Sequence, residues 1–273
     1  MKTQTQENFP VACYLFPKAY RKIITDYYNF ARYCDDITDS FSLEQSEKLH
    51  LLEEAEQSLF GKGNFTYSLK LREDFLHENL DFSLATDLLV AFRADAKNER
   101  YQTWGQLLDY CNYSAVPVGR FMLAIHNENP STYIPAAALC TILQIVNHIQ
   151  DLRSDVKNLN RIYLPQELLD KFSVSPKSLK KTSCSKNLHF LLNDVLQRCN
   201  SLLEDAKILP AIVKNIRLRI YICVVLTLTN ILIKKLYNKD VLATQIKLSK
   251  TERIYATVYG SFKALVVKEK TLS

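Results

Sequence analysis

The chain has 273 residues, of which 47% are hydrophobic and 23% are charged, and its formal net charge is +6. This balance excludes a disordered chain, and the length gives ample material for a buried core. Only 5 glycines and 8 prolines are present, which disfavours strand-rich folds with many turns and favours long helices joined by short loops. We therefore predict an all-α protein in which residues 1–273 form a single domain.

Charge and cysteine usage narrow the class of protein further. Basic residues are scattered apart from a lysine-rich loop at residues 177–186, and no nucleic-acid-binding module accompanies them, so we expect no nucleic acid partner. The 7 cysteines are widely spaced without a CxxC pair, which favours reduced thiols. The first ten residues lack the apolar stretch of a signal peptide. We expect a cytoplasmic protein.

Apolar residues recur at three- and four-residue steps along most of the chain, which predicts helices and no strand. Pro17 precedes the first helix, and Gly61 ends the second. Ser83 is the predicted N-cap of the third helix, whereas Pro117 and Gly119 interrupt the fourth. The predicted helices cover residues 20–39, 43–59, 83–97, 103–126, 134–155, 165–172, 186–208, 210–237 and 251–268.

The longest apolar run covers residues 220–233 and includes Thr227, Thr229 and Asn230. It is shorter than the ~20 residues that a membrane span needs, so we interpret it as a buried core helix. Basic residues bracket the run on both sides, at 217, 219, 234 and 235, which leaves open a peripheral role at the inner face of the membrane.

The first predicted helix ends in the acidic sequence FARYCDDITD at residues 30–39. On an ideal helix that advances about 100° per residue, Asp35, Asp39, Asp36 and Arg32 fall within an arc of about 100°, opposite the apolar face. Like charges four residues apart repel by roughly 0.2–0.5 kcal/mol even in water, so Arg32 or a divalent cation should offset them. Taken alone, the stripe fits a solvated acidic face as well as a metal site.

A second polar stripe follows in QIVNHIQDLRSD at residues 144–155. Gln144, Asn147, His148, Asp151 and Asp155 lie along one side of the predicted helix, opposite its isoleucines, leucine and valine. The stripe contains no lysine or glutamate, which favours the polar wall of a cavity over a water-facing surface. We interpret His148 as a wall residue, with a role as ligand or base left as the alternative.

Two helices thus carry aspartates at i and i+4, as Asp35 with Asp39 and Asp151 with Asp155. Carboxylate oxygens on facing helices suit Mg²⁺, which keeps several waters and commonly bridges to phosphate oxygens. We therefore predict that these four aspartates are metal ligands of a Mg²⁺–diphosphate site that assists departure of a diphosphate leaving group.

These segments resemble the squalene/phytoene synthase family of head-to-head isoprenoid synthases. The resemblance covers most of the chain and fades beyond about residue 240. Within the family, the patterns are most similar to those of bacterial hydroxysqualene synthases of hopanoid and squalene biosynthesis. The similar segments are ENFPVA (7–12), FARYCDDITD (30–39), YCNYSAVPVGR (110–120), LQIVNHIQDLRSD (143–155) and RIYLPQE (161–167).

The resemblance implies an isoprenoid-synthase-type helical bundle with a central cavity, Mg²⁺ as cofactor, and conversion of presqualene diphosphate to hydroxysqualene. It implies that the two aspartate pairs and Tyr110 are catalytic residues. It also implies that the prenyl diphosphate is bound by Arg32, Asp36, Gln144, Asn147, Arg161 and Tyr163.

One departure from the family pattern bears on the product. His148 and Ile149 replace a usual Phe-Trp pair, so the identity of the product stays open. Two alternatives remain: condensation of two farnesyl diphosphates to presqualene diphosphate or squalene, and a non-catalytic role as an assembly factor. We expect pathway enzymes as the remaining class of partner.

Overall fold

The structure, a computed structural model, describes residues 15–237 and 239–267, and within these ranges it contains helices and turns but no strand. This confirms the all-α prediction. The ENFPVA segment and residue 268, the predicted end of the last helix, lie outside the described residues. The helices are α1 (Lys18–Asp39), α2 (Gln45–Leu59), α3 (Thr66–His77), α4 (Ser83–Ala96), α5 (Trp104–Ser114), α6 (Val116–Ile125), α7 (Tyr133–Ser154), α8 (Gln166–Lys171), α9 (Lys186–Ala206), α10 (Leu209–Ile212), α11 (Ile216–Leu236) and α12 (Lys250–Val266).

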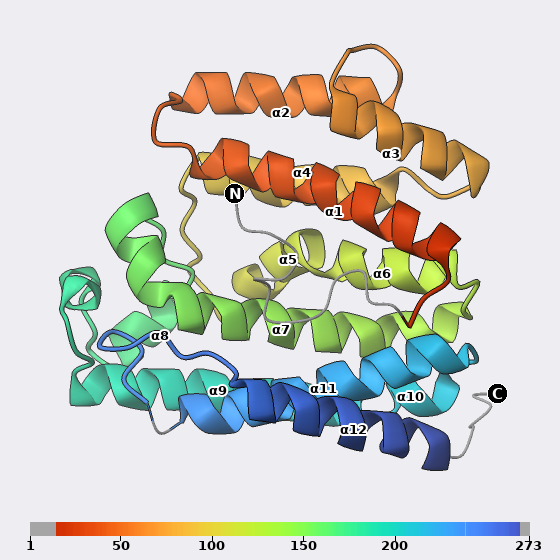
Figure 1. Cartoon of the computed structure of the whole chain (residues 1–273). Helices are drawn as coiled ribbons and strands as arrows, with labels where there is room; N and C mark the ends of the chain where they lie inside the picture. The colour runs from red at the N-terminus through yellow and green to blue at the C-terminus, as the bar shows by residue number, and fades with distance from the viewer. Residues whose placement is uncertain (1–14, 238, 268–273) are drawn as a thin grey trace.

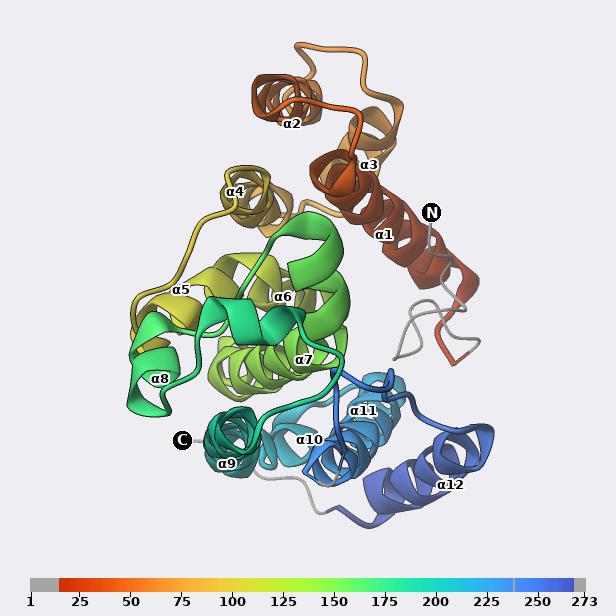
Figure 2. The ribbon, with the colours of Figure 1, turned by 90° about the vertical axis from the view of Figure 1, so that its left-hand side faces the viewer.

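The helices form three layers that both views of the ribbon separate (Figures 1 and 2). Helices α1 to α4 make the upper layer, α5 to α7 the middle layer, and α9 to α12 the lower layer. Helix α7 is central, because it packs against α5, α6, α9 and α11. Helix α1 packs against α2, α3 and α4. Helices α1 and α7, on which the two polar stripes were predicted, thus belong to different layers.

Helix α1 begins just before the apolar residues that recur at helical spacing. Pro17 takes the N-cap position with φ −54° and ψ 155°, an extended conformation that the proline ring favours and that leaves the helix to start at Lys18. The predicted apolar face is buried, including Tyr27 and Phe30. Tyr27 stacks on Phe121 of α6 with ring centroids 4.0 Å apart, and its hydroxyl donates to the Leu84 carbonyl oxygen. These contacts fix the rotation of α1 about its axis.

Two long predicted helices are each divided in the structure. The helix predicted over 103–126 breaks at Ala115, where φ is −131°, and Pro117 lies in the first turn of α6. Gly119 lets α6 approach α7, because a Cβ there would lie 2.5 Å from the Cys140 sulfur. The helix predicted over 210–237 is α10 and α11, separated at Asn215, whose side chain caps α11. Buried Glu128 accepts the backbone N–H groups of this connection.

One helix was not predicted, and one N-cap was predicted at the wrong residue. Helix α3 was not predicted, because its polar sequence TYSLKLREDFLH buries only Ser68, Leu71 and Phe75. Ser83 is not an N-cap: Phe82 occupies that position, and the Asp81 carboxylate accepts the Ser83 N–H. Asp81, which precedes Phe82, therefore caps the helix from outside it.

The apolar run at 220–233 lies within α11 and forms part of the core, as predicted. By length and composition alone, the segments Pro130–Leu159 and Ile216–Leu236 could cross a membrane, but 50% and 61% of their apolar windows are buried inside the fold. Arg219, one of the basic residues that bracket the run, is itself buried and donates to the Val213 carbonyl oxygen. These observations favour core helices.

Candidate functional site

A cavity of about 490 Å³ lies among α1, α4, α5, α6, α7 and α11. Helices α1 and α7 run in the same direction, so that their C-terminal ends lie on the same side of the molecule (Figure 1). The cavity brings together every predicted site residue except Asp36. Those that line it are Arg32, Asp35, Asp39, Tyr110, Gln144, Asn147, Asp151, Asp155, Arg161 and Tyr163.

The cavity is polar toward the C-terminal ends of α1 and α7 and apolar toward their N-terminal halves. On α1, Ile24 and Tyr27 precede Asp35 and Asp39 among the lining residues, and on α7 Cys140 and Leu143 precede Asp151. Further apolar walls come from α6 and α11 at Val118, Phe121, Met122 and Tyr221. Because both helices rise by ~1.5 Å per residue in the same direction, polar and apolar parts coincide on facing walls. The cavity therefore suits an amphiphile with an anionic head and a long apolar chain.

The first acidic motif is held by Arg32. Its guanidinium lies 2.8 Å from an Asp35 oxygen and donates through Nε to Asp36 at 3.0 Å. The second oxygen of Asp36 is buried without a hydrogen-bond partner, and Asp36 does not line the cavity. Asp36 thus orients Arg32 from behind, whereas Asp35 and Asp39 face the cavity.

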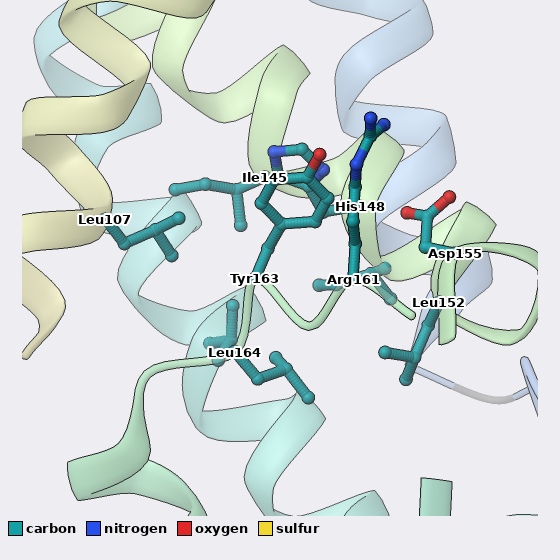
Figure 3. Close-up of a pocket in the computed structure, with 10 residues that line it drawn as sticks. Leu107, Ile145, His148, Leu152, Asp155, Arg161, Tyr163 and Leu164 are labelled. Atoms are coloured by element: carbon teal, nitrogen blue, oxygen red, sulfur yellow. The ribbon is translucent and has the colours of Figure 1, made fainter. Parts of the chain in front are cut away.

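Arg161 joins the two acidic motifs. The chain leaves α7 through a π-helical turn (Asp155–Leu159) and reverses at Asn160, whose φ is 55°. Arg161 then donates its backbone N–H to the Asp155 carbonyl oxygen at 3.0 Å, while its side chain contacts Asp39 at 2.6 Å and the Thr38 carbonyl at 3.0 Å. Figure 3 shows Arg161 extended beside His148, with Asp155 next to it. Arg161 thereby connects the ends of α1 and α7, through its buried guanidinium to Asp39 and through its backbone to Asp155.

Negative charge is concentrated at this end of the cavity. Burial, reinforced by Asp39, raises the pKa of Asp35 to about 7. Burial, reinforced by Asp151, raises the pKa of Asp155 to about 8. The two motifs also end helices, where the macrodipole is negative and disfavours a carboxylate by typically 0.3–1 kcal/mol. Ionising all four acidic groups in these positions therefore reduces stability unless positive charge joins them.

Mg²⁺ fits this donor set, because hard carboxylate oxygens on two walls provide one or two ligands each and leave room for water and phosphate. Within the described residues, the four aspartates do not bring three ligand atoms within 4.8 Å of one another; the group that does is Cys184, His189 and Asp240, away from the cavity. An ion at the aspartates would thus need oxygens from another molecule. A diphosphate head supplies such oxygens.

A buried hydrogen-bonded cluster adjoins the acidic end. Asp95 of α4 accepts from the hydroxyls of Tyr110 at 2.9 Å and Tyr163 at 2.8 Å. His148 stacks on Tyr163 with ring centroids 3.6 Å apart, as Figure 3 shows. Burial, and then Arg161, lowers the pKa of His148 to about 3, so the imidazole is neutral near pH 7. The cluster fixes both tyrosines against the cavity wall.

Asp95 was not predicted from the sequence. Its signal is a carboxylate placed on the buried face of α4, at the helical spacing set by Leu84, Leu88 and Ala91. Burial raises the pKa of Asp95 to about 6, opposed by Arg161 and by the two tyrosine hydrogen bonds. A buried carboxylate with this set of partners is typical of a functional site.

Comparisons with known proteins identify the family to which the chain is similar. The squalene/phytoene synthase family matches residues 2–252. The hydroxysqualene synthase of Rhodopseudomonas palustris is 36% identical over 268 residues, which cover 98% of this chain and 91% of that protein. The hydroxysqualene synthase of Zymomonas mobilis is 34% identical over 256 residues, which cover 93% of this chain and 86% of that protein.

Solved structures give the same picture of the fold. A squalene synthase from Alicyclobacillus acidocaldarius superposes with a TM-score of 0.73 at 26% identity, covering 85% of this chain and 89% of that one. A dehydrosqualene synthase superposes with a TM-score of 0.79 at 22% identity, covering 94% of this chain and 91% of that one. The second similarity bears on the fold alone.

Proposed function

Because the chain belongs to the squalene/phytoene synthase family, we propose that it converts presqualene diphosphate to hydroxysqualene and releases diphosphate, with Mg²⁺ as cofactor. Family membership makes it an enzyme of isoprenoid and squalene biosynthesis that acts on prenyl diphosphates. The predicted isoprenoid-synthase helical bundle is confirmed by the solved relatives. The finer assignment of the reaction is supported by the names of relatives at 34–36% identity.

The observation that carries the proposal is the polarity of the cavity, with two aspartate pairs at one end and an apolar chamber at the other. Asp35, Asp39, Asp151 and Asp155 would hold Mg²⁺, which when bound neutralises charge on the leaving diphosphate. Arg32 adds fixed positive charge beside this group. An apolar chamber then protects the carbocation from premature capture by water.

In the proposed reaction, the C–O bond to diphosphate breaks, the carbon skeleton rearranges, and a water oxygen forms the new C–O bond. The water proton leaves with the diphosphate, so atoms and charge balance. Tyr110 and Tyr163, whose hydroxyls donate to Asp95, line the chamber. Gln144 and Asn147 line the wall between the acidic and apolar ends, where they would orient the substrate.

We further propose that residues 1–273 act as one domain, supported by a buried core that extends from Phe16 to Ala256. We place the enzyme in the cytoplasm, at the inner face of the membrane, beside the enzymes that supply its substrate and consume its product. The apolar product of the proposed reaction supports this placement, since it partitions into lipid.

The test is product analysis with presqualene diphosphate and farnesyl diphosphate offered separately, each with Mg²⁺. We expect a C30 alcohol and free diphosphate from presqualene diphosphate, and loss of both in the Asp151→Asn variant. The exposed Asp205→Asn variant serves as the matched control. Presqualene diphosphate or squalene formed from farnesyl diphosphate would favour the earlier step instead. Full biological function of Asp35→Ala and Asp151→Ala variants would favour an assembly role.

A further inference from the structure

Helix α12 shows an apolar surface to solvent. Seven large side chains, which we call the α12 outer face, project from it: Ile254, Tyr255, Val258, Tyr259, Phe262, Leu265 and Val266. Val258 is 67% exposed and Phe262 is 61% exposed, values unusual for residues of this size along one helix. In both views α12 lies at the edge of the molecule, beyond α11 (Figures 1 and 2). Contiguous exposed apolar patches of this kind mark interaction sites.

The opposite side of α12 packs against α11, which leaves the outer face exposed to solvent. Ala256, Gly260 and Ala264 are buried at four-residue steps and pack against α11. A Cβ on Gly260 would lie 2.7 Å from the Val224 Cα atom, so the backbones of the two helices are in close contact. Since Phe262 lies about 200° from Gly260 around the helix, this close packing holds the outer face away from the protein.

Positive charge borders the outer face, because on an ideal helix Lys250 and Lys263 lie about 40° beyond its two edges. The segment from 247 to 267 contains the basic residues Lys247, Lys250, Arg253 and Lys263. Its one acidic residue is Glu252, which accepts from Lys235 at 2.8 Å and so is neutralised by an ion pair. An apolar face with a basic border is the composition of helices that lie in the plane of an anionic membrane surface.

We propose that the α12 outer face docks on a bilayer that contains anionic phospholipid. Apolar side chains would enter the acyl boundary, and the basic border would contact lipid phosphates. A second copy of the chain fits the face less well, because a two-fold contact would bring the same basic border against itself. The proposal rests on α12 and does not require the proposed reaction, but it gives an apolar product a short path to lipid.

Flotation of the purified full chain with vesicles tests the proposal. We expect binding to phosphatidylcholine vesicles that contain phosphatidylglycerol, weaker binding to pure phosphatidylcholine, and weakening by salt. The double variant Val258→Glu with Phe262→Glu should lose at least about ten-fold in vesicle affinity, because two anchors are replaced by like charge. Its thermal midpoint should match wild type, since both side chains are exposed.

The matched control carries the same charge change on the other side of the molecule. Phe41→Glu with Leu76→Glu alters side chains that are 80% and 57% exposed in the upper layer, and it should bind vesicles as wild type does. Absence of wild-type binding, or equal loss in both double variants, would overturn the proposal. So would a dimer in light scattering that the α12 double variant alone dissociates. Turnover of presqualene diphosphate in detergent, measured separately, reports on the proposed reaction.

Discussion

Asp95 is the residue whose role emerges only from the folded structure. It sits on the buried face of α4 and accepts hydroxyl hydrogen bonds from Tyr110 and Tyr163, which come from α5 and from the segment after the π-helical turn. Both tyrosines line the cavity. Asp95 is therefore a positioning residue, which acts on the substrate through the orientation of two other side chains.

An Asp95→Asn substitution tests this role. The amide can accept one tyrosine hydroxyl but loses the charge, and hydrogen bonds to charged groups contribute about 1.5–3 kcal/mol. We expect kcat to fall about 10- to 100-fold with a smaller change in KM, because Tyr163 is the one predicted diphosphate-binding residue that donates to Asp95. The exposed Asp109→Asn variant of α5 is the control. Unchanged kcat in the variant would show that the tyrosines are held without Asp95.

Asp155 makes the stability of the metal-free protein depend on pH. Burial and Asp151 raise its pKa from an ordinary value of 3.8 to about 8, so the folded protein retains a proton that the unfolded chain releases. Stability from this group is therefore full below about pH 4 and is lost as pH rises through about 8. In chelator, the thermal midpoint should fall between about pH 6 and pH 9, and Asp155→Asn should reduce that fall. An identical fall in the variant would assign the dependence to other groups.

Among the helices, sequence periodicity predicts those that bury a long face of large apolar residues. It identifies α1, α7 and α9, because each repeats large apolar residues over about five turns or more. Pro117 indicates the interruption between α5 and α6, which the structure places at Ala115. Periodicity misses α3, whose buried face is small, and the division at Asn215, which depends on capping. Contacts made in the folded protein decide whether a helix forms or ends at such positions.

Part of the candidate site could likewise be predicted from local spacing, and part depends on the fold. Spacing at i and i+4 places Asp35 with Asp39 and Asp151 with Asp155 on single helix faces, which the sequence alone predicts. The contact between Arg161 and Asp39 joins residues 122 positions apart and depends on the π-helical turn, so no local pattern predicts it. Asp36, which the resemblance assigns to the diphosphate, instead pairs with Arg32 and does not line the cavity.

The close packing between α11 and α12 can be tested by a substitution at Gly260. A Gly260→Ala substitution forces a Cβ against the Val224 backbone, and overpacking of this kind costs typically about 1–3 kcal/mol. We expect a lower midpoint in urea unfolding. Gly105→Ala in α5 is the matched control, since the nearest atom to its Cβ would be the Thr103 hydroxyl oxygen at 3.7 Å. Equal stability of the two variants would contradict the close contact.

Across the molecule as a whole, the cavity lies between α1 of the upper layer and α7 of the middle layer. Direct contact between the acidic ends passes through Arg161, which bears one positive charge against four carboxylates. Ligands that supply further positive charge and phosphate oxygens should therefore stabilise the whole fold, because they join two layers.

Thermal unfolding with Mg²⁺ and inorganic diphosphate together tests this coupling. At ligand concentrations near 100 times Kd, binding adds about 2.7 kcal/mol, which corresponds to a rise of roughly 5 °C in Tm for a chain of this size. Mg²⁺ alone should give a smaller rise. The double variant Asp39→Asn with Asp151→Asn should show none of the combined effect. A full response in that variant would place the ligands elsewhere.

The shared direction of α1 and α7 has a consequence for the order of events in a catalytic cycle. Since both walls change from apolar to acidic in the same sense, the cavity accepts an amphiphile in one orientation and anchors it by its head. Once the head has been cleaved off, the hydrocarbon has no anchor and is free to leave, whereas diphosphate keeps its hold on the acidic end. Inhibition by product should therefore come from diphosphate, as competition with the substrate, and the step that limits turnover should be release of the smaller product.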